Sequence, residues 1–355
     1  MPKEQTGPLV NLDFVRSFAV ALVVISHASG YAHRPRVLGY DIWFFGILGV
    51  CIFFVHTTLV LMWSLQRDAD TLSFYLRRIF RLWPLWAVVF GLYLGLHIAA
   101  SPYYAFDFRY FAPRRKEVLA NILLVFNLVF GANVVGASWS LPVEMQMYVL
   151  LPFLFAYVRA HRLLWPLLVL DALLCLTAYT QLPAINTSLL FCGGLFLPGA
   201  MAYVLFQRER KLLPSFLFPP WVVALVLAVN TWGSKQQNSI RGGWILCLLL
   251  GLSLPHFREM QSAVIRNASA IIARYSYSIY LAHIPCLAVA MHYWPRGGTV
   301  ERTLVFFVTL TASCYLLYHL IEAPFIRVGA RIARRLNGRS RLTLAQQTTD
   351  LNPAP

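Results

Sequence analysis

The chain has 355 residues, of which 59% are hydrophobic and 12% are charged. The charged share is about half of that in soluble globular proteins, which excludes an ordinary soluble domain. Apolar runs such as LLWPLLVLDALLCL do not alternate with polar residues, so a membrane β-barrel is excluded as well. The net charge of +16 lies mainly in loops between apolar runs, where it indicates membrane topology rather than a nucleic-acid partner. We therefore predict an all-α fold, a polytopic bundle of transmembrane helices.

Ten apolar runs are predicted to cross the membrane. In chain order they cover residues 12–31, 43–64, 79–98, 140–158, 164–180, 187–207, 219–232, 242–256, 271–293 and 303–322. The first is interpreted as a retained span, because no small-residue cleavage site follows it cleanly. The run 118–135 is also apolar but contains three asparagines, and we predict that it does not span the membrane.

The distribution of basic residues predicts the orientation. An even number of spans places both termini on the same side. Lys and Arg are in excess at the two ends and in the loops after the even-numbered spans, so both termini are expected in the cytoplasm. We expect a transmembrane domain at 1–328 and a basic, largely disordered cytoplasmic tail at 329–355, which begins as an interfacial helix from Arg327 onward.

The first predicted span carries two ionisable residues, Arg16 and His27. Eleven positions at 100° per residue bring them onto one face, about 16 Å apart along the helix axis. Asp13 lies one turn before Arg16 and is placed to pair with it. Ionisable groups inside a span usually face the protein interior or a water-filled cavity and act there. The structural alternative is a snorkelling arginine and a satisfied interfacial histidine.

Three arginines stand at the cytoplasmic entrance of the third span, in FYLRRIFRLWPLW. They are Arg77, Arg78 and Arg81. Arg78 and Arg81 are one turn apart, so both guanidinium groups can address one anion, and their planar forks suit phosphate. The alternative is that their positive charge only anchors the topology.

The fourth span carries a carboxylate near its start, in SWSLPVEMQMYVLLP. Pro142 fits only the first turn of a helix, so this span begins here, on the outer side. Glu144 then lies in that first turn, with Tyr148 one turn further along the same face. Glu144 either orients or deprotonates a partner group, or complements the helix dipole.

Two further polar groups of residues lie near the C-terminus. Ser276, Tyr280 and His283 follow one face of the ninth span, where interhelical hydrogen bonding is the structural alternative to a functional role. Glu322 is expected to cap a helix or to pair with Arg327 at the cytoplasmic face. The six cysteines are isolated in apolar runs, so we expect neither a disulfide framework nor a metal site.

The polar motifs together resemble acyltransferase family 3, a family of bacterial inner-membrane O-acyltransferases that acetylate surface polysaccharides. The resemblance covers roughly residues 9 to 328 and rests on NLDFVRSFAVALVVISHA, RRIFRLWP, SWSLPVEMQMYVLLP, YSYSIYLAHIP and LIEAPFIR. Each motif alone is weak, but five in the family's order are specific. Ala323 stands where a basic residue is common before the last proline, which makes the acceptor harder to infer.

The resemblance implies about ten spans, cytoplasmic termini and a location in the bacterial inner membrane. It implies an acyl-CoA donor, usually acetyl-CoA, used as a substrate with no permanently bound cofactor. The acceptor would be a hydroxyl of a cell-surface glycan, a lipid-linked saccharide or a related small molecule. The chain shows no hydrolase-like domain such as some members carry, so the membrane part, or a separate periplasmic partner, would complete the transfer.

By motif match, Arg16 and His27 correspond to the family's essential arginine and histidine, and Glu144 to its glutamate after the Trp-Ser-Leu motif. Arg78 and Arg81, with Arg77 beside them, match the arginines that would bind the CoA phosphates. We predict that His27 is the general base, that Arg16 stabilises the oxyanion or steers the donor, and that Glu144 holds His27 in one tautomer or binds the acceptor. The alternative is a transporter or flippase without acyl chemistry.

Overall fold

The computed structural model describes residues 9–29, 36–68, 70–97, 112–129, 131–180, 189–208, 211–233, 239–294 and 297–351. Helices dominate these residues, and the described strands are the two short partners of a hairpin, β1 (Arg36–Val37) and β2 (Tyr40–Asp41). The α-helices are α1 (Val10–Ser29), α2 (Ile42–Arg67), α3 (Thr71–Gly95), α4 (Arg115–Ile122), α5 (Ser140–His161), α6 (Trp165–Thr180), α7 (Leu189–Cys192), α8 (Leu197–Phe206), α9 (Phe218–Gly233), α10 (Ser239–Ser253), α11 (Ala263–Ala288), α12 (Thr299–Leu317) and α13 (Ala323–Leu351).

Short helical turns of other kinds connect several of these helices. The 3-10 turns are η2 (Gly136–Trp139), η4 (Gly193–Leu195), η5 (Ser215–Leu217) and η7 (Leu254–His256). Two π-helical turns, η8 (Val289–Tyr293) and η9 (Tyr318–Glu322), follow α11 and α12. The predicted all-α class is therefore confirmed, and the predicted runs coincide with helices or with helices joined by such turns.

Six described segments are long and apolar enough to cross a membrane. They are Val10–Ser29, Ile42–Arg67, Gly136–His161, Leu189–Phe206, Ser215–Gly233 and Thr299–Asn337. These apolar helices make the chain a membrane protein. The count of ten spans stays a prediction, since α3 and α11 carry arginines within their length and α6 and α10 are short.

Aspartate side chains cap the N-termini of two long helices, α2 and α3. The Asp41 carboxylate accepts a hydrogen bond from the backbone N–H of Trp43 (3.0 Å), and the Asp70 carboxylate accepts one from Ser73 (2.7 Å). These contacts satisfy amide groups that have no partner within the helix. Helices α2 and α3 therefore begin at defined residues.

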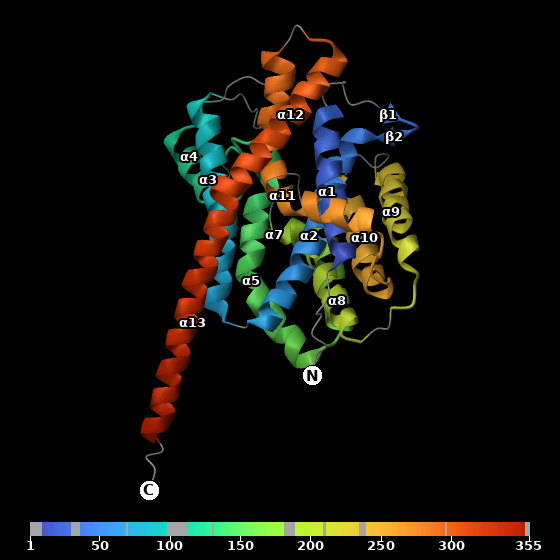
Figure 1. Cartoon of the computed structure of the whole chain (residues 1–355). Coiled ribbons are helices and arrows are strands. Elements are labelled where there is room, and N and C mark those ends of the chain that lie inside the picture. The colour runs from blue at the N-terminus through green and yellow to red at the C-terminus, as the bar shows by residue number, and fades with distance from the viewer. Residues whose placement is uncertain are drawn as a thin grey trace.

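Helix α2 lies at the centre of the bundle, in contact with α1, α8, α10 and α5 (Figure 1). Glycines allow these close approaches: a Cβ at Gly49 would lie 2.6 Å from the Ala19 carbonyl oxygen of α1, and one at Gly199 would lie 2.4 Å from the Val55 carbonyl oxygen of α2. Such small residues let helix backbones meet where the surrounding lipid gives no hydrophobic drive.

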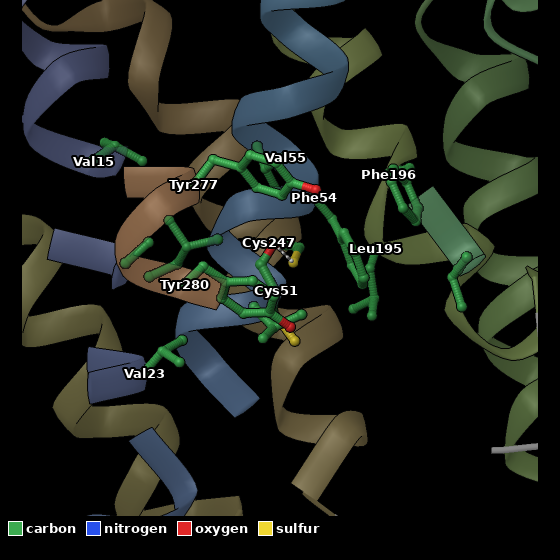
Figure 2. Packing of buried hydrophobic residues seen from close by; sticks show 14 of the residues in the cluster. Val15, Val23, Cys51, Phe54, Val55, Leu195, Phe196, Cys247, Tyr277 and Tyr280 are labelled. Atoms are coloured by element: carbon green, nitrogen blue, oxygen red, sulfur yellow. Dashed lines mark hydrogen bonds between the residues drawn. The ribbon is translucent and has the colours of Figure 1, made fainter. Parts of the chain in front are cut away.

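The core around α2 combines aliphatic, aromatic and thiol side chains (Figure 2). Phe54 stacks on Phe196, with ring centroids 4.2 Å apart. The Cys247 thiol donates to the Cys51 carbonyl oxygen (3.3 Å). Tyr280 of α11 packs against α2 on the side opposite Phe196, so α11 also contributes to this core (Figure 2).

The segment 118–135 does not cross the membrane as a helix. Helix α4 ends at Ile122, and turns follow. The buried Asn121 amide donates to the carbonyl oxygens of Glu117 and Ala132 and accepts from the backbone N–H of Val134. Asn121, one of the three asparagines of this run, thus holds the segment 131–134 against α4.

The C-terminal segment was expected to form an interfacial helix followed by disorder. In the structure α13 is a helix from Ala323 to Leu351 and extends past the bundle (Figure 1). Its first half packs along α3: the Ser73 hydroxyl donates to the Ala333 carbonyl oxygen (3.2 Å), and the Asn337 amide donates to the Asp68 carboxylate. Gly329 permits this packing, since a Cβ there would lie 2.5 Å from Phe80. Helix α1 begins, and α13 ends, toward the same end of the molecule.

Candidate active site

A cavity of about 220 Å³ lies between α1, α2, α3, α5 and α11. One wall is apolar and includes Phe53, Phe54 and Leu82. The ionisable residues that line it are Arg16, His56, Arg78, Arg81, Glu144, Tyr148, Tyr277 and Tyr280. Four of the six residues predicted for the site therefore converge here from three helices that are far apart in the sequence.

Three guanidinium groups face this cavity. Arg16 comes from α1, and Arg78 and Arg81 come from successive turns of α3, as the sequence predicted. None of the three forms an ion pair with a carboxylate among the described residues. The Arg78 Nε atom is buried and has no hydrogen-bond partner. The cavity therefore presents an excess of cationic hydrogen-bond donors.

Glu144 opposes the arginines across the cavity. It accepts a hydrogen bond from the Tyr148 hydroxyl, one turn further along α5, as the spacing predicted. The carboxylate also lies within electrostatic range of all three arginines. The described hydrogen bond of Glu144 is with Tyr148, and His27 lies outside the residues that line the cavity. The two roles predicted for Glu144, holding the His27 tautomer and binding the acceptor, stay predictions.

Tyrosines of α11 tie the cavity walls together. The Tyr277 hydroxyl donates to the Leu82 carbonyl oxygen of α3 (2.9 Å). The Tyr280 hydroxyl donates to the Ala137 carbonyl oxygen and lies 2.9 Å from the Ser140 hydroxyl at the start of α5. These contacts fix α11 against α3 and α5. The cavity is thus held by hydrogen bonds between helices rather than by loops.

His27 lies outside the residues that line the cavity. Its ring packs against the Trp43 ring, with centroids 5.8 Å apart, and against the His283 ring, with centroids 4.8 Å apart. His283 in turn neighbours Tyr280, which does line the cavity (centroids 6.1 Å apart). The two histidines therefore lie behind Tyr280, which separates them from the cavity.

Arg77 does not share the site predicted for it. Its Nη1 atom lies 2.6 Å from the Asp68 carboxylate at the end of α2. Arg77 lies one turn before Arg81 on α3, but its side chain turns to Asp68 and is not among the residues that line the cavity. Its described ion pair connects the α2–α3 turn, and Arg78 and Arg81 are the arginines of α3 that line the cavity.

Two predicted ion pairs are also replaced by other contacts. Asp13 and Arg16 form no ion pair, although they lie within electrostatic range of each other. Glu322 is buried and accepts a hydrogen bond from the Ser278 hydroxyl (2.8 Å), while Arg327 donates to the Ala323 carbonyl oxygen instead. Glu322 lies within electrostatic range of Arg81 and Arg16, so it is a second carboxylate, after Glu144, that interacts with these arginines.

Sequence reasoning missed His56 and Tyr277. His56 of α2 is buried and lines the cavity. It is the one histidine in an otherwise apolar run, so the rule that selected Arg16 and His27 would have selected it too. Tyr277 gave no such signal, because tyrosine is common in membrane helices and its role depends on what it contacts.

Comparison with known proteins identifies the chain. A family model described as an acyltransferase domain matches residues 9–319. The chain belongs to acyltransferase family 3. Members at low identity include nodulation protein 10 of Rhizobium leguminosarum bv. viciae, 25% identical over 94% of this chain and 98% of that protein. The O-acetyltransferase OatA of Staphylococcus aureus is 23% identical over 90% of this chain, but over only 58% of its own length. No solved structure is detectably similar.

An acyltransferase of this family needs a place for its donor, a base and a stabilised oxyanion. The cavity is lined by cationic donors, by the Glu144 carboxylate and by aromatic and hydroxyl groups such as those of Tyr280 and Ser140. The described residues contain no group of three His, Cys, Asp or Glu side chains placed to hold a metal ion. The groups that this site can bring to acyl transfer are therefore guanidinium, hydroxyl, carboxylate and imidazole.

Proposed function

We propose that this acyltransferase moves an acyl group, most simply acetyl, from cytoplasmic acyl-CoA to a hydroxyl of a cell-surface glycan or a lipid-linked saccharide. We place it in the bacterial inner membrane. The O-acetyltransferase named among its relatives supports the acetyl group and the oxygen acceptor.

The observation that carries the proposal is the convergence of Arg16, Arg78 and Arg81 on one cavity. Two carboxylates, Glu144 and Glu322, lie within electrostatic range, which leaves an excess of positive charge even when both are ionised. Cationic groups inside a membrane protein are costly without a counter-ion. An anionic ligand would supply it, and the phosphates of CoA match the fork geometry of guanidinium groups.

The position of His27 fits an elongated donor. Arg16 and His27 are eleven residues apart on α1, a rise of about 16 Å. Acyl-CoA likewise separates its phosphates from its thioester by a flexible arm. With the phosphates at the arginine end, the arm would follow the cavity past Tyr280 and bring the thioester toward the histidine pair.

The proposed reaction needs one base and one leaving group. His27 accepts the proton of the acceptor hydroxyl as the oxygen bonds to the thioester carbonyl carbon. The carbonyl oxygen becomes an oxyanion, and the C–S bond then breaks to release the CoA thiolate, which takes up a proton. If the transfer ends on the far side of the membrane, the membrane part itself or a separate periplasmic partner completes it.

The test uses the purified protein in nanodiscs with radiolabelled acetyl-CoA. Binding and slow thioester hydrolysis are measured for the wild type and for His27→Ala. We expect both proteins to bind, and hydrolysis to fall by about 10²–10⁴-fold in the variant, the usual cost of losing an acid–base group. Undiminished hydrolysis by His27→Ala removes His27 from the chemistry. Absence of binding in both proteins, or transport of a solute without any acyl product, contradicts the donor.

A further inference from the structure

His27 and His283 form a buried pair between α1 and α11. The His283 Nε2 atom lies 3.2 Å from the His27 Nδ1 atom. The Nδ1 atom of each ring is also hydrogen-bonded to a backbone carbonyl oxygen one turn earlier in its own helix. His27 bonds to Val23 (2.9 Å) and His283 to Ile279 (3.2 Å). His283 is fully buried, whereas His27 is half-buried.

These contacts determine the tautomers. A carbonyl oxygen can only accept a hydrogen bond, so the Nδ1 atom of each histidine must carry the proton. A neutral His283 protonated on Nδ1 keeps its lone pair on Nε2, the atom that faces His27. The His27 Nδ1–H group then donates to both the Val23 carbonyl oxygen and the His283 Nε2 atom. The lone pair of His27 is left on Nε2, where a general base requires it.

We infer that His283 is a positioning residue that holds the ring orientation of His27 as a second acceptor for its Nδ1–H group, whose proton the Val23 carbonyl oxygen already requires. The inference rests on the proposed function, in which His27 is the base. In hydrolases with a catalytic triad a carboxylate accepts from the Nδ1–H group of the base. Here the carboxylate nearest in the site, Glu144, is bound to Tyr148, and a neutral imidazole takes the place of that acceptor.

The surroundings of the pair support a fixed orientation. Trp43 covers the His27 ring edge-on, with an interplanar angle of 70°. Tyr280, which lies beside His283, is itself bound to the Ala137 carbonyl oxygen and the Ser140 hydroxyl. His283, the hydrogen-bond acceptor for His27, is therefore supported by Tyr280, whose hydrogen bonds connect α11 to the start of α5. Tyr280, which supports His283 from this side, also forms part of the cavity wall.

Two substitutions of His283 separate positioning from packing. In His283→Gln the amide oxygen reaches the place of the Nε2 atom and can still accept from His27. In His283→Asn the shorter amide can contact the Ile279 carbonyl oxygen but does not reach His27. We expect the asparagine variant to lose turnover by about 10–100-fold, the range seen when the partner of a functional histidine is removed. The glutamine variant should stay within a few-fold of the wild type, and both should bind acetyl-CoA with unchanged Kd.

The tautomer is read directly by ¹⁵N NMR of ring-labelled histidine, with the His27 signals assigned by their loss in His27→Ala. We expect the Nδ1–H tautomer in the wild type and in both variants, because the Val23 carbonyl oxygen still accepts from it, and a shifted His27 Nδ1 resonance in His283→Asn, where the second acceptor is lost. Equal loss of turnover in the two variants, or an unchanged His27 Nδ1 resonance in His283→Asn, overturns the inference. Undiminished hydrolysis by His27→Ala would remove the proposed base and still leave the NMR test of the pair decisive.

Discussion

The arginines of the cavity provide the sharpest test of donor binding at the scale of single residues. Arg78→Lys and Arg81→Lys keep the charge but replace a planar fork by a point charge. We expect each to raise the Kd for acetyl-CoA by about 10-fold, equivalent to roughly 1.4 kcal/mol. Titration calorimetry in nanodiscs measures this directly.

Arg77→Lys is the matched control for these two variants. It sits beside Arg78 on the same helix, but its described ion pair is with Asp68, away from the cavity. Its Kd should equal that of the wild type. Unchanged affinity in all three variants would mean that the arginines only anchor the topology.

Four of the six residues that the sequence singled out line the cavity, but their partners were predicted less well. Arg16 and Glu144 stood out because an ionisable group in an apolar run must face the protein interior. Their partners depend on tertiary packing. Glu322 was predicted to cap a helix or to pair with Arg327, five residues away, but a π-helical turn follows α12 and places the Glu322 carboxylate beside Ser278 of α11. Nothing local in the sequence signals that rotation.

At the scale of helices, Asp68 joins three elements. It ends α2, accepts a hydrogen bond from Arg77 of α3 (2.6 Å) and accepts another from Asn337 of α13. Burial alone would raise the pKa of Asp68, but the hydrogen bonds from Arg77, the Asp70 backbone and Asn337 outweigh it and hold the pKa below its ordinary value of 3.8. A carboxyl whose folded pKa is depressed stabilises the fold above its ordinary pKa and loses this contribution as the pH falls through the folded value.

Asp68→Asn should therefore destabilise the protein at neutral pH and have no effect in acid. Because Asp68 is only half-buried, we expect a loss of about 0.5–1 kcal/mol at pH 7. Scanning fluorimetry in detergent compares the Tm of the variant with that of the wild type from pH 7 down to pH 3. The difference should shrink below about pH 4. A difference that persists unchanged at the lowest pH would show that the carboxylate charge is not what stabilises this junction.

Helix positions were predictable, but helix ends were less so. The lengths of the apolar runs predicted where the helices lie, and Pro142 correctly predicted the first turn of α5. The tail was expected to begin as an interfacial helix and then to be disordered, because its composition is basic and polar. It forms a helix through Leu351, and its first half gains packing partners on α3, such as Ser73 and Phe80, which composition cannot reveal.

At the scale of the whole molecule, orientation decides whether the site can work as proposed. Arg16 lies near the start of α1, and His27 lies near its end. The hairpin β1–β2 follows the end of α1, while α13 ends at the opposite end of the molecule (Figure 1). If the termini are cytoplasmic, the arginines face the compartment that contains acyl-CoA, and the histidine pair lies toward the outer side.

Cysteine labelling tests this orientation. Single cysteines are introduced by Arg36→Cys in the hairpin and Thr343→Cys in α13, in a background whose six native cysteines are replaced by alanine or serine. We expect a membrane-impermeant maleimide to label position 36 in right-side-out vesicles and position 343 only in inside-out vesicles. The reverse pattern would place the arginine end of the cavity outside, where acyl-CoA is absent, and would contradict the proposed donor. The expected pattern would give the transfer a direction, from the arginines on the inner side toward His27 and a surface acceptor on the outer side.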